Sequence, residues 1–280
     1  MALHISSLNS GSNGNCYYIG NDDEAVLIDA GLSCRETEKR MALLGLSMKL
    51  VKGIFISHEH SDHIRGLERL ATKYNLPVMI TGNTCTRGGM RLKKEQVKDF
   101  LPYKPVMIGN ISVTAFPKFH DAADPHSFMV SYLGINIGVF TDIGKPCERL
   151  TKYFALCHAA FLEANYDEAL LENGRYPIYL KNRIRGGNGH LSNSQALEVF
   201  TRFKPSYMTH LFLSHLSKEN NSPELVHKLF TAHSTGTNII IASRHEATAV
   251  YTIVSTVTNS RVKKRIPVLV IRSQQLSLFE

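Results

Sequence analysis

A chain of 280 residues with 43% hydrophobic residues can bury one large core, so a single main domain is expected. No segment approaches the roughly 18 consecutive apolar residues of a membrane span, and the first residues lack the layout of a secretory signal. The formal net charge of +8 favours a polyanionic partner, although an ordinary solvated surface is compatible with the same charge. Five cysteines without a C-x-x-C pair predict free thiols in a cytoplasmic protein.

The chain is predicted to open as a β-meander, because three short runs of β-forming residues are separated by turn residues. The strands cover residues 3–8, 16–20 and 25–29. The turn at residues 10–15 offers small side chains and backbone N–H groups to a phosphate, and a plain flexible turn fits the same residues equally well.

An alternation of helices and strands follows. Ser33 is the expected N-cap of a helix through Leu44, with Glu36 completing a capping box. Gly45 ends this helix. Strand, helix and strand are expected within residues 53–81, which is the rhythm of an α/β protein.

A cluster of metal-ligand side chains follows a short apolar strand, in the run Ser57-His58-Glu59-His60-Ser61-Asp62-His63. Imidazole nitrogens and carboxylate oxygens are ligands that Zn²⁺, Mn²⁺ and Fe²⁺ accept. His58 and His60 can converge on one ion, whereas the adjacent Asp62 and His63 diverge toward a second. Four ligands to one ion would crowd the loop, so the spacing favours two metals over a solvated His-rich loop. A helix beginning at residues 64–67 is expected to point its N-terminus at this site.

Further strands are predicted at residues 106–108, 111–119, 128–133 and 135–141. His120 follows the second of these strands and Asp142 follows the last. The remaining predicted elements are strands at 157–165 and 206–213, helices at 167–172 and from Ser192 or Asn193 to Phe203, and two strands within 238–254.

The H-x-H-x-D-H loop resembles the signature of the metallo-β-lactamase superfamily, and the wider chain resembles the YycJ/WalJ (VicX) family of bacterial DNA exonucleases. The matching segments are SGSNGN from Ser10, LIDAG from Leu27, the metal loop, HDAADP from His120, TDIG from Thr141, GHLSN from Gly189 and HLS from His215. Their order from residue 10 to about 222 makes the resemblance specific. It implies a four-layer αββα sandwich, which we assign to residues 1–258, and a tail at 259–280. Tyr166 departs from the family, which commonly has histidine there.

The resemblance also implies a dinuclear site. One metal ion would be held by His58, His60 and His120, the other by Asp62, His63 and His215, and both would share Asp142. Asp29 would hold the metal loop without binding an ion, as carboxylates behind ligating histidines do. The expected substrate contacts are Ser10, Ser12, Asn13, Asn165 and Asn193.

Three residues are candidates for proton transfer. Asp62 is positioned to accept the nucleophile's proton. Glu163 and His190 occupy positions similar to the Glu and His that assist leaving-group protonation in tRNA 3′-processing relatives. The alternative for His190 is a structural role at the start of a helix, where its side chain would only hydrogen-bond to the backbone.

The implied function is that of a metal-dependent phosphodiesterase acting on DNA, with the 5′-to-3′ direction and a place in replication or mismatch repair resting on the resemblance alone. An RNA-processing nuclease or a hydrolase of small phosphodiesters or thioesters is an open alternative on the same fold. A clamp-tethered DNA-binding protein is an alternative of another class. The ligand types do not distinguish Zn, Mn and Fe.

The chain ends in a short motif with apolar anchors. Gln275, Leu276, Leu278 and Phe279 resemble the pentapeptide by which bacterial replication and repair proteins bind the sliding clamp. Apolar residues at a chain end often mark a partner site. An ordinary terminal strand or docking segment is the alternative interpretation.

Overall fold

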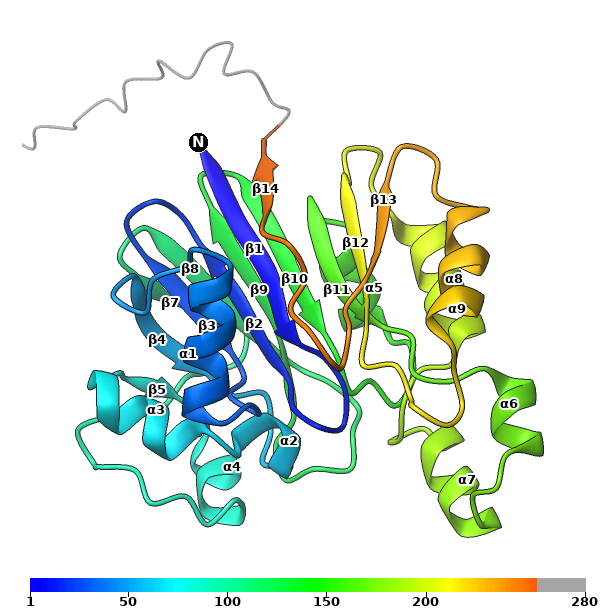
Figure 1. The fold of residues 1–280 in the computed structure, drawn as a ribbon, viewed down its shortest axis with the longest axis horizontal. Coiled ribbons are helices and arrows are strands. Elements are labelled where there is room, and N and C mark those ends of the chain that lie inside the picture. The colour runs from blue at the N-terminus through cyan, green and yellow to red at the C-terminus, as the bar shows by residue number, and fades with distance from the viewer. Residues whose placement is uncertain (256–280) are drawn as a thin grey trace, which may run out of the picture.

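A computed structural model describes residues 1–255, which form two stacked sheets flanked by helices (Figure 1). The first sheet has seven strands in the spatial order β14 (Tyr251–Val254), β1 (Ala2–Asn9), β2 (Cys16–Gly20), β3 (Ala25–Ile28), β4 (Val51–Phe55), β5 (Val78–Met79) and β6 (Val97–Lys98). The second has β13 (Asn238–Ile241), β12 (His210–Ser214), β11 (Ala159–Glu163), β10 (Ile135–Phe140), β9 (His126–Tyr132), β8 (Ile111–Pro117) and β7 (Pro105–Ile108). The predicted four-layer αββα sandwich is confirmed.

Three apolar layers hold the sandwich together. The central layer lies between the sheets and includes Ile5, Val26, Val130 and Phe161, all buried. Because helices cover the other face of each sheet, strands such as β2, β3 and β11 are buried at every position and do not alternate.

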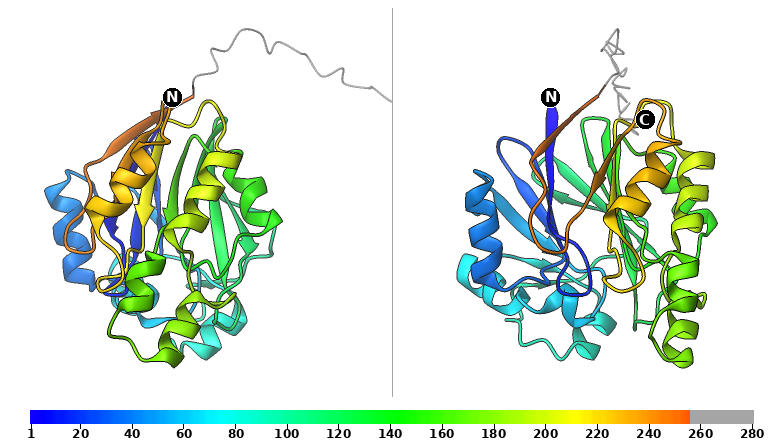
Figure 2. Two further views of the ribbon diagram at one scale, coloured as in Figure 1. Left: turned by 90° about the vertical axis from the view of Figure 1, so that its right-hand side faces the viewer. Right: turned by 45° about the vertical axis from the view of Figure 1, so that its right-hand side comes forward.

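The helices divide between the two outer faces, as the views in Figure 2 show. The helices along the first half of the chain are α1 (Cys34–Leu43), α2 (Ser61–Ile64), α3 (Leu67–Tyr74) and α4 (Gly82–Arg87). Those of the second half are α5 (Glu148–Phe154), α6 (Glu168–Asn173), α7 (Ile178–Arg185), α8 (Asn193–Phe203) and α9 (Pro223–Thr231). None of these helices is long and apolar enough to cross a bilayer.

Both sheets are mixed, and this mixture positions the site. Strands β3 to β6 of the first sheet run parallel to one another, and so do β10 to β13 of the second. Ligand sites in such sheets lie beyond the carboxyl ends of parallel strands. The loops that follow β3, β4, β10, β11 and β12 carry Asp29, the H-x-H-x-D-H run, Asp142, the residues after Glu163, and His215.

Some predicted elements differ in the structure. Helix α3 begins at Leu67, within the start expected at residues 64–67, but a separate short helix α2 that was not predicted begins at Ser61, inside the metal loop. Ser33 caps α1, but the Glu36 carboxylate accepts from Arg40 Nε at 2.7 Å and no capping box forms. The predicted Ser192 cap is present, with a complete capping box to Gln195.

Helices α4, α5, α7 and α9 were not predicted. The sequence does contain start signals for helix α9, because Ser222 is its N-cap and Pro223 its first residue. The predicted domain boundary at residue 258 and the tail of residues 259–280 lie outside the described residues.

Candidate metal centre

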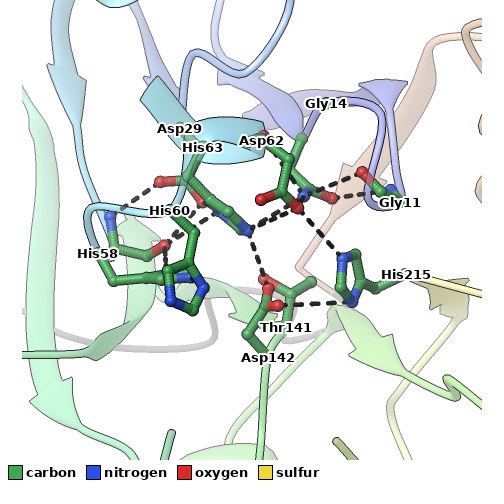
Figure 3. Close-up of polar contacts among 12 residues, drawn as sticks. Gly11, Gly14, Asp29, His58, His60, Asp62, His63, Thr141, Asp142 and His215 are labelled. Atoms are coloured by element: carbon green, nitrogen blue, oxygen red, sulfur yellow. Dashed lines mark hydrogen bonds and ion pairs between the residues drawn. The ribbon is translucent and has the colours of Figure 1, made fainter. Parts of the chain in front are cut away.

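Loops from both sheets bring nine side chains together at one edge of the sandwich. Figure 3 labels His58, His60, Asp62, His63, Asp142 and His215. They form overlapping groups whose ligand atoms lie within 4.8 Å of one another: His58, His60 and His120; His58, His63 and Asp142; Asp62, His63 and His215; and Asp142, Glu163, His190 and His215. The first and third groups are the two predicted ligand trios, and Asp142 occurs in the other two. All seven predicted metal ligands therefore converge, together with Glu163 and His190.

The first trio presents three ring nitrogens to a common point. His58 Nε2 lies 3.1 Å from His60 Nδ1, and His120 Nε2 lies 3.3 Å from the same atom. The opposite nitrogens of two rings are occupied: His58 Nδ1 contacts Ser57 Oγ at 2.9 Å, and His120 Nδ1 contacts the Gly189 carbonyl at 3.0 Å. A hydrogen bond at one nitrogen fixes the tautomer that leaves the other as a ligand.

The second trio is oriented by buried carboxylates. His63 Nδ1 contacts Asp29 Oδ2 at 2.7 Å, and both side chains are fully buried. Asp29 also accepts from Ser57 N at 2.8 Å and from Ser57 Oγ at 2.9 Å, which ties the metal loop to the end of β3. These contacts leave His63 Nε2 facing Asp62 and Asp142, at 3.5 and 3.1 Å.

Two buried atoms at the centre lack hydrogen bonds within residues 1–255. They are Asp142 Oδ2 and His215 Nε2. Asp142 Oδ2 lies 3.1 Å from His63 Nε2 and His215 Nε2 lies 3.5 Å from Asp62 Oδ2, and neither contact has hydrogen-bond geometry. Buried polar atoms are rarely left unpaired unless they have a ligand or a function. A divalent cation fits these atoms, because imidazole nitrogen and carboxylate oxygen are its ligands.

Three site residues within two positions of a strand end have a left-handed backbone. Asp29 has φ 61°, Asp142 has φ 54° and His215 has φ 56°. Such conformations are uncommon outside glycine and cluster at functional sites. Each turns the chain sharply at the end of a strand, so that the side chain points along the sheet edge into the centre.

The electrostatic environment differs between the two trios. Burial lowers the pKa of His58 well below its usual value and lowers that of His120 to about 3, so both rings are neutral at pH 7. Burial also opposes charge on His63 and His215, but Asp29, Asp142, Asp62 and Glu163 outweigh it. The pKa of His63 is raised well above its usual value and that of His215 is raised to about 10. Both rings are therefore cationic in the metal-free protein.

Metal binding at the second trio is expected to release protons. A cation that binds Asp62, His63 and His215 must displace a proton from each of the two histidines, because their raised pKa values keep both rings protonated at pH 7. We therefore expect the release of about two protons per ion. Calorimetric titration in two buffers of different ionisation enthalpy measures this number. Metal affinity that is independent of pH between about 6 and 9 would contradict the expectation.

The same raised pKa values predict how the metal-free protein responds to pH. In the unfolded chain these histidines titrate near about 6.5. Their contribution to the free energy of unfolding is therefore complete below about 6.5, and it is lost as pH rises through the folded pKa of His215, about 10.

Glu163 lies behind the centre and positions two histidines. Its side chain is fully buried, and Oε1 lies 2.8 Å from His190 Nδ1 and 2.9 Å from His215 Nδ1. Its Oε2 accepts from Ile143 N at 2.7 Å and Leu191 N at 3.1 Å. The expectation that Glu163 assists leaving-group protonation therefore stays a prediction, in which Glu163 acts through His190. His190 is the exposed member of the pair, with 18% of its side chain accessible.

Three of the predicted substrate contacts have side chains that hydrogen-bond within the protein. Asn165 is buried and donates to the His215 carbonyl at 2.7 Å, so it holds the His215 turn. Asn193 is fully buried and exchanges hydrogen bonds with Asn221 at 3.0 and 2.9 Å. Ser10 Oγ accepts from His215 N at 2.8 Å. Ser12 and Asn13 are exposed at the edge of the site.

Three residues of the centre were not predicted. The Ser57 hydroxyl bridges Asp29 and His58. Asn15 Nδ2 lies 3.1 Å from both Asp62 Oδ2 and His63 Nε2. Lys118 is buried and donates to the Thr141 carbonyl at 2.8 Å, directly before Asp142. A lysine in an apolar strand two residues before a ligand histidine is a signal that sequence reasoning could have used.

Tyr166 replaces a histidine that the family commonly has. Its side chain is 4% exposed, and its carbonyl accepts from Asn193 N at 2.8 Å. Burial raises the pKa of its hydroxyl to about 12. The residue is therefore a neutral part of the wall behind the centre.

Comparison with known proteins decides the family. Over 236 residues the chain is 36% identical to exodeoxyribonuclease YycJ of Bacillus anthracis, and the match covers 80% of this chain and 86% of that protein. The chain belongs to the YycJ/WalJ family. Exodeoxyribonuclease WalJ of Streptococcus pneumoniae, a second relative, is 32% identical over 81% of this chain and 86% of its own length. The metallo-beta-lactamase superfamily matches residues 10–141.

Solved structures at lower identity share the fold of this YycJ/WalJ family member. The metallo-beta-lactamase fold protein YhfI of Bacillus subtilis matches with a TM-score of 0.69 at 14% identity, over 90% of this chain and 100% of that one. The short form of human tRNase Z matches with a TM-score of 0.61 at 15% identity, over 89% of this chain and 99% of that one.

Proposed function

We propose that this protein is a divalent-metal-dependent exodeoxyribonuclease that degrades DNA from the 5′ end. The observation that carries the proposal is the convergence of two His/Asp trios around Asp142, in a chain whose relatives are named exodeoxyribonucleases. The formal charge of +8 adds attraction to a phosphate backbone.

We assign one ion to His58, His60 and His120, a second to Asp62, His63 and His215, and Asp142 to both. Zn²⁺, Mn²⁺ and Fe²⁺ all fit these ligands. A pair of bound ions supplies neutralisation of charge on the phosphate and a water of lowered pKa.

The chain's own residues provide two further functions. Asp62 is 16% exposed whereas Asp142 is 3% exposed, so Asp62 is the central carboxylate that an entering water can reach. Its low pKa, caused mainly by His63 and His215 against the opposing effect of burial, keeps it ionised as a proton acceptor. His190 is held through Nδ1 by Glu163 and offers Nε2 to the departing oxygen.

The test uses the full chain loaded with Mn²⁺ or Zn²⁺ and duplexes labelled at either the 5′ or the 3′ end, beside matched RNA. Early release of short products from the 5′ label, lost in His60→Ala, is the expected result. Cleavage of RNA alone would favour an RNA-processing nuclease. Turnover of only small phosphodiesters or thioesters would favour the other hydrolases, and DNA binding without any turnover would favour the tethered binding protein.

His190→Ala is expected to lower kcat on DNA by about 100-fold while metal content stays unchanged, because a general acid contributes about 10² to 10⁴. A substrate with a good leaving group, bis(p-nitrophenyl) phosphate, should lose much less activity, because its leaving group needs no proton. His233→Ala, in an exposed turn after α9, is the matched control. An equal loss on both substrates would contradict the proton-donor role.

We further propose that residues 259–280 form a tail outside the folded domain of residues 1–258. Gln275, Leu276, Leu278 and Phe279 lie outside the described residues, and their sequence supports a bacterial sliding clamp as partner. Deleting residues 275–280 is expected to abolish clamp binding in a calorimetric titration and to leave hydrolysis of short duplexes unchanged. Unchanged clamp affinity would refute the assignment.

A further inference from the structure

A pocket of about 410 Å³ lies beside the metal centre, on the side of His215. Its lining includes Ser10, Leu216, Ser217, Lys218, Ile241 and Arg244. Ser10 connects it to the centre, because Ser10 Oγ accepts from His215 N at 2.8 Å. Figure 3 shows Gly11 on this same side, opposite His58 and His60. The volume falls in the roughly 300–1,000 Å³ range of small-ligand pockets.

The outer wall of the pocket is a loop held in place by three successive carbonyls. Ser243 O accepts from Ser10 N at 3.1 Å, Arg244 O from Asn13 Nδ2 at 2.7 Å, and His245 O from Arg40 Nη2 at 2.8 Å. The donors all come from the first 40 residues, which include the turn at the edge of the metal centre. The loop after β13 is therefore fixed against the site before any ligand binds, which lowers the entropic cost of binding.

Gly11 packs against this loop. A Cβ at Gly11 would lie 3.4 Å from Arg244 Cβ and 3.8 Å from the Leu216 carbonyl, which is ordinary contact, so the φ of 136°, and not a lack of space, disfavours a side chain here. The carbonyl of Gly11 accepts from Asn15 Nδ2, which also contacts Asp62. Gly11, the neighbour of the pocket residue Ser10, is thus linked to Asp62 through Asn15.

Arg244 is a cation whose side chain has no partner in the described part of the chain. Within residues 1–255 its guanidinium makes no hydrogen bond or ion pair, although the residue is only partly exposed. Arg40, behind the same loop, has its guanidinium fully engaged by Glu36, Leu8, Asn9 and His245. An unpaired guanidinium at the wall of a fixed pocket is suited to bidentate phosphate binding.

We propose that this pocket binds the 5′-terminal nucleotide of the DNA strand being degraded, with Arg244 on its 5′-phosphate. The apolar side chains of Leu216 and Ile241 provide a surface for the sugar and base. The next phosphate along the strand would then lie at the metal centre, past Ser10 and His215. This inference rests on the proposed exonuclease function and adds to it the residue that recognises the end of the strand.

Other charges at the pocket modulate this recognition. Lys218 is a second cation, 69% exposed and only 3.9 Å from Glu219. Glu246 also lines the pocket and carries the opposite charge. A carboxylate near a phosphate weakens its binding, so Glu246→Gln is expected to strengthen the preference that Arg244 creates.

The test compares hairpin duplexes that carry either a 5′-phosphate or a 5′-hydroxyl at their single open end. The full metal-loaded chain is expected to show a KM about tenfold to a hundredfold lower for the phosphorylated end, the range for a charge-assisted bidentate contact. Arg244→Ala should raise that KM to the value for the hydroxyl end. Hydrolysis of bis(p-nitrophenyl) phosphate should be unchanged, as it should in Lys152→Ala, which removes a cation from the exposed surface of α5.

Fluorescence anisotropy with the same duplexes separates failure of the inference from failure of the function. A 5′-phosphate preference that persists in Arg244→Ala, or no preference in the unmodified chain, would overturn the inference and leave an exonuclease intact. Loss of the binding preference in Arg244→Ala without degradation of any DNA would overturn the function and support the pocket.

Discussion

Asp142→Asn is expected to lower kcat/KM on DNA by at least about 100-fold and to reduce the metal content of the purified protein. Asp142 contacts His63 at 3.1 Å through Oδ2 and His215 at 3.5 Å through Oδ1, so both proposed ion positions depend on its charge. Asparagine has the same size and tolerates the left-handed backbone at φ 54°, so the variant tests charge and not the turn. Initial rates and elemental analysis measure the two effects.

The matched control makes the same chemical change on the surface. The side chain of Asp22 is 94% exposed and lies 3.2 Å from His4 Nε2. Asp22→Asn should keep its activity and metal content. An Asp142→Asn protein with unchanged kcat/KM and full metal content would show that the carboxylate does not hold the ions.

Asp29→Asn is expected to destabilise the metal-free protein by about 3 kcal/mol and to weaken metal affinity by about 10- to 100-fold. The buried carboxylate receives two hydrogen bonds from Ser57 and lies 2.7 Å from His63 Nδ1. Asparagine cannot carry the negative charge that holds the His63 proton on Nδ1, so the ring loses its fixed orientation. Urea unfolding and metal titration measure the two effects.

Ser57→Ala provides a graded comparison, because it removes one hydroxyl and keeps the Asp29 carboxylate. A loss of about 1 kcal/mol is expected for that variant. If Asp29→Asn were as stable as the unmodified chain and bound metal equally tightly, the pair of Asp29 and His63 would not organise the centre.

The amino-acid sequence by itself determined the order of the strands and the ligands. Hydrophobic periodicity and turn residues predicted β2, β3 and β10 within a residue or two of their observed bounds. Ser33 identified the start of α1 through its side-chain cap. Such signals are local, because propensity, capping and burial of a short strand are settled by residues near one another in the chain.

Only the tertiary structure decided which polar residues face the site and which support it. Asn165 and Glu163 lie near the end of β11 with the chemistry of substrate contacts, yet both are buried behind His215. Sequence gives the residue type, whereas burial depends on strands far away in the chain, here β12 beside β11. The left-handed turns at Asp29 and Asp142 are likewise imposed by the surrounding fold.

The pairing of the first and last described strands could not be predicted from local sequence either. Strand β14 pairs with β1, with Ala2 opposite Val254, although about 250 residues separate them. This pairing carries the loop of Ser243, Arg244 and His245 against the turn at residues 10–15. No local sequence pattern indicates the contact between this loop and the turn, because the contact is stabilised by the packing of strands that are far apart in the chain. The sequence therefore determined the chemistry of the centre, and the long-range packing of its first and last strands determined the pocket beside it.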